Sequence, residues 1–191
     1  MDITKKIRKE PFMDLFPVPA VLVSSVCEGV KPNIITIAWT GVMASGPLVV
    51  YISIRPTGRH SYGLIKKSME YVINIPTVEQ VKLVDFCGMV SGRDVDKFAK
   101  TGLTPLPASQ VQAPLIAECP VNLECRVRQI VSLGTHDVFV ADVLAVHYNE
   151  EVLGPKGRPD INLIKPFSFC ANEYWSLTEK IGTFGYSIQS K

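Results

Sequence analysis

Five residues able to bind an anion lie within seven positions of the chain: Arg55, Thr57, Arg59, His60 and Ser61. An arginine guanidinium forms paired hydrogen bonds to phosphate oxygens, and hydroxyl groups add further donors. Apolar residues then recur at intervals of three and four, which predicts a helix over residues 59–69. Because a helix N-terminus presents unpaired N–H groups and the positive end of its dipole, this stretch predicts a phosphate site.

A solvated turn is the plainer interpretation of the same residues. Arginines at a helix N-terminus oppose the dipole, however, and without an anion they are slightly unfavourable there. Ser53 is a further candidate, because it lies in an apolar stretch where a buried hydroxyl needs a partner, and it shares a strand face with Arg55. His60 fits either a second phosphate donor or a solvent-facing helix residue, and we leave it out of the predicted site.

The residues before this cluster predict strands. Residues 34–39 and 48–54 are rich in Ile, Val, Tyr and Trp, and residues 18–26 form a similar run. Thr40-Gly41 and Ser45-Gly46-Pro47 supply turn chemistry between them. Connections this short exclude crossover helices, so we expect strands 18–26, 33–39 and 48–55 to form an antiparallel meander.

The rest of the chain alternates strands with short helices. We expect an N-terminal arm with a short helix (1–17) and, after the helix at 59–69, a strand (71–75). Two helices follow: one is opened by a Thr77–Gln80 capping box and ends near Gly88, and the other is capped at Ser91–Asp94 and ends at Gly102. The remaining segments are a proline-rich loop (103–120), strands with one solvent-facing side (121–128 and 138–146), a surface loop (149–160), an edge strand interrupted at Pro166 (161–170) and a C-terminal docking tail (171–191). Short antiparallel strands in this number favour a barrel, and we expect one domain over residues 1–191: a mainly β fold with short inserted helices and an anion site.

Composition excludes several classes of protein. Twenty basic and eighteen acidic residues give a net charge of +2 without a concentrated basic patch, which argues against nucleic-acid binding. The five cysteines are odd in number and lack C-x-x-C spacing, so neither a disulfide framework nor a metal site is predicted, and Cys125 is expected to be a buried thiol. The apolar runs are too short to cross a membrane, and the polar N-terminus lacks a signal peptide, so a cytoplasmic protein is expected.

Five motifs in order resemble the flavin reductase-like FMN-binding family. They are P-N-I-I-T-I-A-W-T-G, S-I-R-P-x-x-R-H-S, S-G-R-D-V-D-K-F, L-G-T-H-D-V-F-V-A-D-V and the closing Y-W-x-L-x-E-K-I-G-x-x-G-Y-S, which is similar to the flavoredoxin branch in particular. The similarity covers roughly residues 11–187. One position departs from the branch pattern, since Thr178 stands where Gly is usual, and this affects the path of the C-terminal segment.

The resemblance implies an FMN-binding split β-barrel of the antiparallel Greek-key type, usually a homodimer with flavin near the subunit interface. It assigns to the flavin ring and ribityl chain Asn33, Thr36, Ala38, Trp39, Thr40, Ser53 and Arg55. It assigns Arg59 and Ser61 to the phosphate, with Lys97 as a further positive charge, although pattern alone favours an exposed helix lysine at that position. It also places His136 facing the pocket, with Tyr174 and Trp175 covering it from the same or the partner subunit.

The functional hypothesis is an FMN-dependent oxidoreductase that passes electrons from NADH or NADPH through the flavin to an acceptor. Flavin carries out hydride or single-electron chemistry itself, so neither a protein nucleophile nor a metal is required. A flavoredoxin-type carrier that exchanges electrons with a redox protein is the alternative within redox chemistry. A non-enzymatic binding barrel is the alternative from another class, and a pyridoxal phosphate protein is disfavoured because no lysine stands where a Schiff base is expected.

Overall fold

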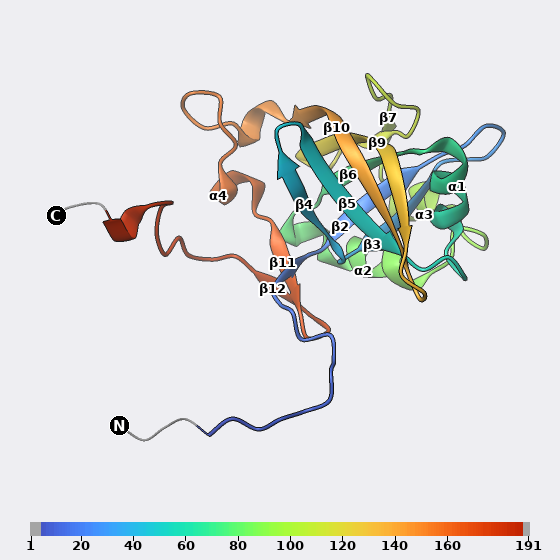
Figure 1. Ribbon diagram of the computed structural model, residues 1–191. Coiled ribbons are helices and arrows are strands. Elements are labelled where there is room, and N and C mark those ends of the chain that lie inside the picture. Colours follow the sequence, from blue (N-terminus) through green and yellow to red (C-terminus); the bar gives the residue numbers. More distant parts are fainter. Residues whose placement is uncertain (1–4, 189–191) are drawn as a thin grey trace.

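The computed structural model describes residues 5–188, and most of its regular structure is antiparallel strand (Figure 1). The strands are β1 (Val18–Pro19), β2 (Val21–Ser25), β3 (Asn33–Ile37), β4 (Thr40–Ser45), β5 (Leu48–Ile54), β6 (Glu70–Ile75), β7 (Pro105–Leu106), β8 (Leu115–Ile116), β9 (Val121–Ser132), β10 (Asp137–Tyr148), β11 (Phe167–Cys170) and β12 (Glu173–Ser176). The helices are α1 (His60–Ser68), α2 (Val81–Met89), α3 (Lys97–Thr101) and α4 (Ile161–Ile164), with short 3₁₀ turns η1 (Val78–Gln80), η2 (Glu150–Val152) and η3 (Tyr186–Ile188).

Seven strands form one antiparallel sheet in the order β3-β2-β6-β9-β10-β5-β4. The two edge strands, β3 and β4, are consecutive in the chain and only Ala38 and Trp39 separate them. A connection of that length spans about 10 Å at most, so the sheet curls until its two edges meet at this corner. Because β3 and β4 are not hydrogen-bonded neighbours, the barrel is split there.

The β9–β10 hairpin lies between β5 and β6 in the sheet, which is a non-sequential strand order. The predicted fold class, a mainly β antiparallel barrel with short inserted helices, is therefore confirmed. The predicted meander is confirmed in its first pair, since β2 and β3 are antiparallel neighbours, and wrong in its second, because β5 pairs with β4 and β10 and not with β3. Thr40 and Gly41, which the sequence suggested as a turn, instead begin β4, and the Thr40 hydroxyl donates to the Tyr51 carbonyl (2.5 Å) and holds that strand start against β5.

Strands β2 and β3 are buried on both faces, which explains their nearly continuous apolar sequence. On one face, Val23 and Ile35 belong to the barrel core together with Ile52, Ile65 and Phe139. The opposite face contributes Leu22 and Ile34 to a second core under α2 and α3, with partners Val84, Cys87 and Phe98. The helices therefore cover the outside of the barrel wall that carries β3.

Strand β9 departs from the predicted pattern of one solvent-facing side. Arg126 and Arg128 are exposed as expected, but Asn122 and Glu124 are buried. The loop between α3 and β9 covers them and supplies their partners: Glu124 accepts the backbone N–H of Ser109 (2.8 Å) and of Val111 (3.1 Å). A polar residue at an alternating position can thus be buried when a loop supplies its hydrogen bonds.

Several local predictions hold and others fail. The Gln80 side chain accepts the Thr77 N–H (2.8 Å) at the predicted cap, Cys125 is fully buried, and Gly102 ends α3 with a φ of 74°. The edge strand expected over residues 161–170 is wrong in its first half, where Asp160 accepts the Asn162 N–H and opens α4. No helix forms over residues 5–17, whose apolar side chains are exposed rather than packed on one face.

The C-terminal segment pairs with the body through β12, which is antiparallel to β11. After Ser176 the chain extends away from the barrel, as does the N-terminal arm (Figure 1). The predicted docking of the tail is thus seen within one chain only for its first part, where Tyr174 packs on Phe167. Ile181 and Phe184 are exposed, and the last three residues of the tail lie outside the described range. Over residues 5–188, no helix combines the length and apolar character needed to cross a membrane.

Candidate functional site

Two small hollows lie side by side where the barrel is split. The first, of about 190 Å³, is lined by Ile37, Ala38, Trp39, Ser53, Ile54, Arg55, Arg59 and His136. The second, of about 200 Å³, lies between the start of α1 and the segment that joins α2 to α3, and Asn33, Arg59, Ser61, Cys87, Gly92 and Lys97 are among the residues that line it. Arg59 lines both, so the two hollows adjoin at its side chain. We call the first the ring hollow and the second the phosphate hollow.

The floor of the phosphate hollow is a fixed polar contact between β3 and α1. The Asn33 side-chain amide donates to the Ser61 hydroxyl (2.8 Å), and both side chains are buried. Gly92 packs directly on this pair, because a Cβ atom at that position would lie 2.0 Å from the Asn33 side-chain oxygen. Residue 92 must therefore be glycine for the loop after α2 to close the hollow.

Lys97 provides a buried cation on the wall of the phosphate hollow. Its ammonium donates to the carbonyl oxygens of Ile34 (2.7 Å) and Cys87 (2.6 Å), and the residue is only 3% exposed. Burial lowers the pKa of Lys97 to about 8, with the Cys87 thiol opposing the shift and the Arg59 charge adding to it. Since an ammonium has three donors and two are used, one N–H remains for a ligand.

The phosphate hollow carries positive charge without acidic neighbours. No Asp or Glu is among its lining residues, and none of the ion pairs found among residues 5–188 involves Arg55, Arg59 or Lys97. Arg59 is the N-cap of α1 and makes no side-chain cap, so the amide groups of the first turn face the hollow without a competing side chain. A buried ammonium, a guanidinium, a hydroxyl and a helix N-terminus together form a site for a phosphate-sized anion.

The ring hollow has an aromatic wall. The rings of Trp39 and His136 lie with centroids 4.5 Å apart and an interplanar angle of 50°. Burial, followed by the charges of Arg55 and Arg59, lowers the pKa of His136, which keeps the imidazole neutral at pH 7. The flat, half-exposed surface beside these rings is suited to a planar aromatic group.

The next residue, Asp137, fixes the hairpin that carries His136. Its carboxylate accepts hydrogen bonds from the hydroxyl groups of Tyr62 on α1 (2.6 Å) and Ser132 on β9 (2.6 Å). These contacts, led by the Ser132 bond, lower the pKa of Asp137. The hairpin turn is thereby tied to the same helix whose N-terminus borders the phosphate hollow.

The structure brings together most of the residues that the sequence assigned to the site. The residues that line one or both hollows are Asn33, Ala38, Trp39, Ser53, Arg55, Arg59, Ser61, Lys97 and His136. Ser53 is half-buried, and its hydroxyl makes no hydrogen bond to another described residue. The pattern-based expectation of an exposed Lys97 is wrong, because its side chain turns inward between β3 and α2.

Four assigned residues lie elsewhere. Thr36 faces α2, where its hydroxyl donates to the Val84 carbonyl, because it alternates with Asn33 and Ile35 along β3. Thr40 is turned toward β5. Tyr174 donates to Asp85 on α2 (3.1 Å), and Trp175 is 56% exposed on β12, so neither lines a hollow within one chain.

Sequence reasoning missed the role of the segment after α2. Ser91-Gly92 was interpreted as a helix cap, but the side chain that caps α3 is Asp96, which accepts the Ala99 N–H (3.2 Å). Ser91 and Gly92 instead close the phosphate hollow. The signal was the glycine itself, since a glycine inside an apparent cap often marks close backbone approach.

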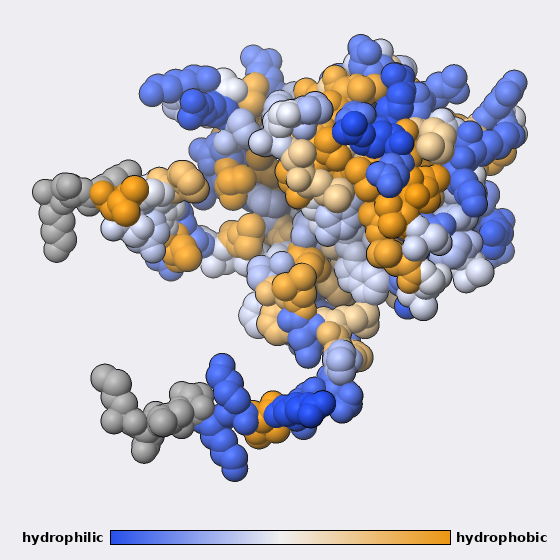
Figure 2. Space-filling view, viewed as in Figure 1, coloured by the Kyte–Doolittle hydropathy of each residue, from blue (hydrophilic) through white to orange (hydrophobic). Residues whose placement is uncertain are grey.

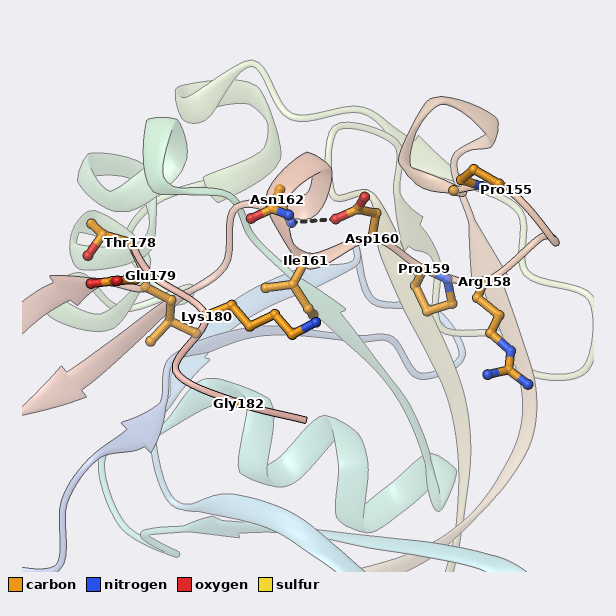
Figure 3. A pocket seen from close by; sticks show the side chains of 12 residues that line it. Pro155, Arg158, Pro159, Asp160, Ile161, Asn162, Thr178, Glu179, Lys180 and Gly182 are labelled. Carbon is orange, nitrogen blue, oxygen red and sulfur yellow. Dashed lines mark hydrogen bonds between the residues drawn. The ribbon is translucent and has the colours of Figure 1, made fainter. Parts of the chain in front are cut away.

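A larger hollow, about 660 Å³, lies elsewhere, between the loop before α4 and the C-terminal segment (Figure 3). Its charged residues are mixed in sign, with Arg158 and Lys180 against Asp160 and Glu179. Asp160 is already engaged as the cap of α4. This hollow shares no lining residue with the ring hollow or the phosphate hollow. Within residues 5–188, no three His, Cys, Asp or Glu side chains gather in a way that could hold a metal ion.

Comparison with known proteins agrees with this geometry. Residues 13–176 match the family model described as "Flavin reductase like domain". An uncharacterized protein of Archaeoglobus fulgidus is 36% identical over 148 residues, which cover 78% of this chain and 81% of that protein. Among solved structures, flavoredoxin of Desulfovibrio vulgaris (Miyazaki F) superposes with a TM-score of 0.90 at 29% identity, covering 97% of this chain and all of that one. Flavoredoxin from Methanosarcina acetivorans gives a TM-score of 0.84 at 27% identity, covering 98% of this chain and 100% of that one. The chain therefore belongs to the flavin reductase-like family, and within it resembles the flavoredoxins.

Proposed function

We propose that this chain binds FMN and passes electrons from a reduced nicotinamide nucleotide, NADH or NADPH, through the flavin to an acceptor. The observation that carries the proposal is the pair of adjoining hollows joined at Arg59. One is basic, which suits a phosphate, and the other has an aromatic wall that suits a planar ring. FMN has these two parts, joined by a short polar chain.

The residues present fit FMN. Arg59, Ser61 and the free N–H of Lys97 would hold the phosphate, in a hollow without a carboxylate that would repel it. Asn33, Ser53 and Arg55 would hydrogen-bond the ribityl chain and the polar edge of the ring, and Ala38 and Trp39 would line the ring face. The bound flavin supplies the hydride or single-electron chemistry.

The protein's own contribution is to position the flavin ring and to shield it from water. At the corner between β3 and β4, the backbone N–H of Trp39 is our candidate donor to the ring, because the neighbouring Thr40 N–H is already donated to the Ala38 carbonyl (3.2 Å). The Trp39 carbonyl accepts the Ser53 N–H (2.9 Å), which fixes the corner between β3 and β4 beside β5. Trp39 and His136 exclude water from one side of the hollow.

We further propose that two copies of the chain form the complete site. Exposed apolar side chains gather on the barrel face that carries β4 and β10 and on both terminal segments (Figure 2). They include Phe12, Met13, Leu15, Phe16, Val42, Met43, Leu144, Trp175, Leu177, Ile181 and Phe184. A second copy would bury this surface, and the exposed Trp175 could then reach the ring hollow of the partner. Gel filtration should give about twice the chain mass of 21.1 kDa, and a monomer that still holds flavin would refute the shared site.

The similarity to flavoredoxins supports a second candidate, an electron carrier between proteins with little direct oxidation of nicotinamide nucleotides. Absorption spectra of the purified protein test flavin binding, which both candidates require. Stopped-flow mixing of the flavin-loaded protein with NADH and with NADPH then separates them. Rapid bleaching of the flavin band supports the reductase, whereas a band that persists with both nucleotides and bleaches with a reduced carrier protein supports the carrier.

A further inference from the structure

His136 depends on the hairpin between β9 and β10 for its place in the ring hollow. Over residues 5–188, the imidazole has one hydrogen-bonding partner, the hydroxyl of the preceding residue Thr135 (3.0 Å), and one aromatic neighbour, the ring of Trp39. The turn over residues 132–135 is exposed and so has little packing of its own. The imidazole therefore lies where the backbone of the hairpin puts it.

The residue directly after His136 ties this hairpin to the body of the protein. Asp137 is only 7% exposed, and its two carboxylate oxygens bind different elements. Oδ2 accepts a hydrogen bond from the hydroxyl of Tyr62 on α1 (2.6 Å), and Oδ1 accepts one from the hydroxyl of Ser132 on β9 (2.6 Å). Asp137 thus bridges α1 and the hairpin at the position next to His136.

Tyr62 is a fixed anchor for that bridge. Its ring packs edge-on against Phe139 of the barrel core, with centroids 5.6 Å apart and an interplanar angle of 75°. Its hydroxyl also accepts a hydrogen bond from the Lys66 ammonium (3.2 Å), one turn further along α1. Because the hydroxyl accepts from Lys66, its own proton is left for the Asp137 carboxylate, and a hydrogen bond to an ionised acceptor is one of the stronger kinds.

We infer that Asp137 is a positioning residue for the flavin ring: its bridge between α1 and β9 holds His136 against Trp39 and so keeps the aromatic wall of the ring hollow in place. The inference rests on the proposed function, because it assumes that the flavin ring lies in that hollow. Asp137 lines neither hollow, so it acts on the ring only through His136. It should therefore govern the affinity for the ring and leave the contribution of the phosphate unchanged.

Riboflavin measures the ring part of the affinity, and the ratio of FMN to riboflavin affinity measures the phosphate part. Both flavins are titrated into the flavin-stripped protein by calorimetry. Asp137→Leu removes both acceptor oxygens and should weaken riboflavin binding roughly tenfold, the effect of one hydrogen bond to a charged group, with the ratio unchanged. Asp137→Asn has the same shape, with an oxygen for one hydroxyl and an amide donor for the other, and should keep riboflavin affinity close to that of the wild type.

Asp142→Leu is the matched control. It removes a carboxylate from the same strand, β10, that also reaches across to β9, where it pairs with Arg128 (3.1 Å). Asp142 lines neither hollow and is not bound to α1. This variant should change neither the riboflavin affinity nor the ratio.

A second measurement follows His136 itself in the flavin-free protein. Its imidazole NMR signals carry the ring-current shift of Trp39, whose ring centroid is 4.5 Å away. Tyr62→Phe keeps the ring that packs on Phe139 but removes the hydroxyl, so this variant and Asp137→Leu should both move the His136 signals. The signals of His147, at the other end of β10, should not move. Tyr62→Phe should also weaken riboflavin binding, with the ratio again unchanged.

Each other outcome is decisive. Riboflavin affinity equal to that of the wild type in Asp137→Leu and Tyr62→Phe, or unmoved His136 signals, would overturn the positioning role and leave the proposed function standing. So would a loss that extends to the ratio or to Asp142→Leu, because it would reflect a general loss of structure. Asp137→Asn as weak as Asp137→Leu would show that the charge acts and not the bridge. A wild type that binds neither flavin would refute the proposed function and, with it, any role of Asp137 toward the ring.

Discussion

Replacing Lys97 by methionine should weaken flavin nucleotide binding and, at the same time, should not destabilise the flavin-free protein. Methionine keeps the length of the side chain in its pocket between β3 and α2 but removes the charge and the donors. In the wild type, two of the three ammonium N–H groups are held by Ile34 and Cys87 and the third is available to the phosphate. Its loss removes one charge-assisted hydrogen bond, so FMN affinity should fall by about 1.5–3 kcal/mol.

The stability effect follows from the lowered pKa of the buried Lys97. A fall from 10.5 to about 8 means that the charged form costs the folded protein about 3 kcal/mol at pH 7. The two carbonyl groups that lose a donor in the variant offset part of the gain, so the net effect should lie between zero and that value. This cost is present in full below pH 8 and disappears as the pH rises to 10.5, because between these values the unfolded chain holds the proton and the folded chain does not.

Thermal unfolding of the flavin-free protein at pH 7 and pH 9.5 measures how the Lys97 charge changes the free energy of unfolding. Lys100→Met, on the same helix, is the control. Wild type and control should gain stability relative to Lys97→Met as the pH rises above about 8. The FMN affinity of the wild type should fall over the same range, since the phosphate binds the protonated form, while riboflavin binding should not change. FMN affinity equal in Lys97→Met and wild type, or independent of pH between 7 and 9.5, would refute the assignment of Lys97 to the phosphate.

Three further substitutions test Arg59, Gly92 and the buried carboxylate of Glu124. Arg59→Ala should reduce FMN affinity by about 1–3 kcal/mol in calorimetric titration, and an unchanged affinity would remove Arg59 from the phosphate role. Gly92→Ala places a Cβ 2.0 Å from the Asn33 side-chain oxygen, so it should displace Asn33 from Ser61 and weaken FMN binding about tenfold or more. The control Gly63→Ala, at a helical position of α1 with no atom within 4 Å of the added Cβ, should not weaken binding. Glu124→Gln should lower the free energy of unfolding by about 2–3 kcal/mol in urea titration, because the carboxylate accepts hydrogen bonds from the backbone of three loop residues and from His147. Burial raises the pKa of Glu124, but these hydrogen bonds outweigh it and lower the pKa to about 2. The stability that the carboxylate contributes should therefore be lost as the pH falls from 4.5 toward 2.

Much of the barrel could be predicted because its strands carry their own signals. Runs of β-branched residues bounded by Gly and Pro indicated β2, β3, β5 and β10 within a few residues. Strand β4 was missed since Thr40-Gly41 has the composition of a turn, and only the barrel closure at Ala38 and Trp39 makes it an edge strand. Residues 161–164 were given to a strand although Asp160 is a local helix cap, because the apolar run after it fits both structures.

The candidate site, too, could be predicted from the sequence only in part. The cluster at Arg55, Arg59 and Ser61 is local in sequence, and so could be interpreted directly as an anion site. Lys97 is remote from it, and its pattern indicated an exposed helix residue; only the family resemblance placed it in the site. Burial of Glu124, in turn, depends on which loop folds over β9, a long-range feature that alternation of polar and apolar residues does not encode.

We propose above all that the hollow bounded by Arg59, Ser61 and Lys97 binds the phosphate of a flavin nucleotide. Titrating the flavin-stripped protein with FMN and with riboflavin, at one pH and ionic strength, measures the contribution of that phosphate directly. We expect FMN to bind at least on the order of a hundredfold more tightly than riboflavin, the effect of two charge-assisted hydrogen bonds. Equal affinity for the two flavins, or binding of neither, would contradict it.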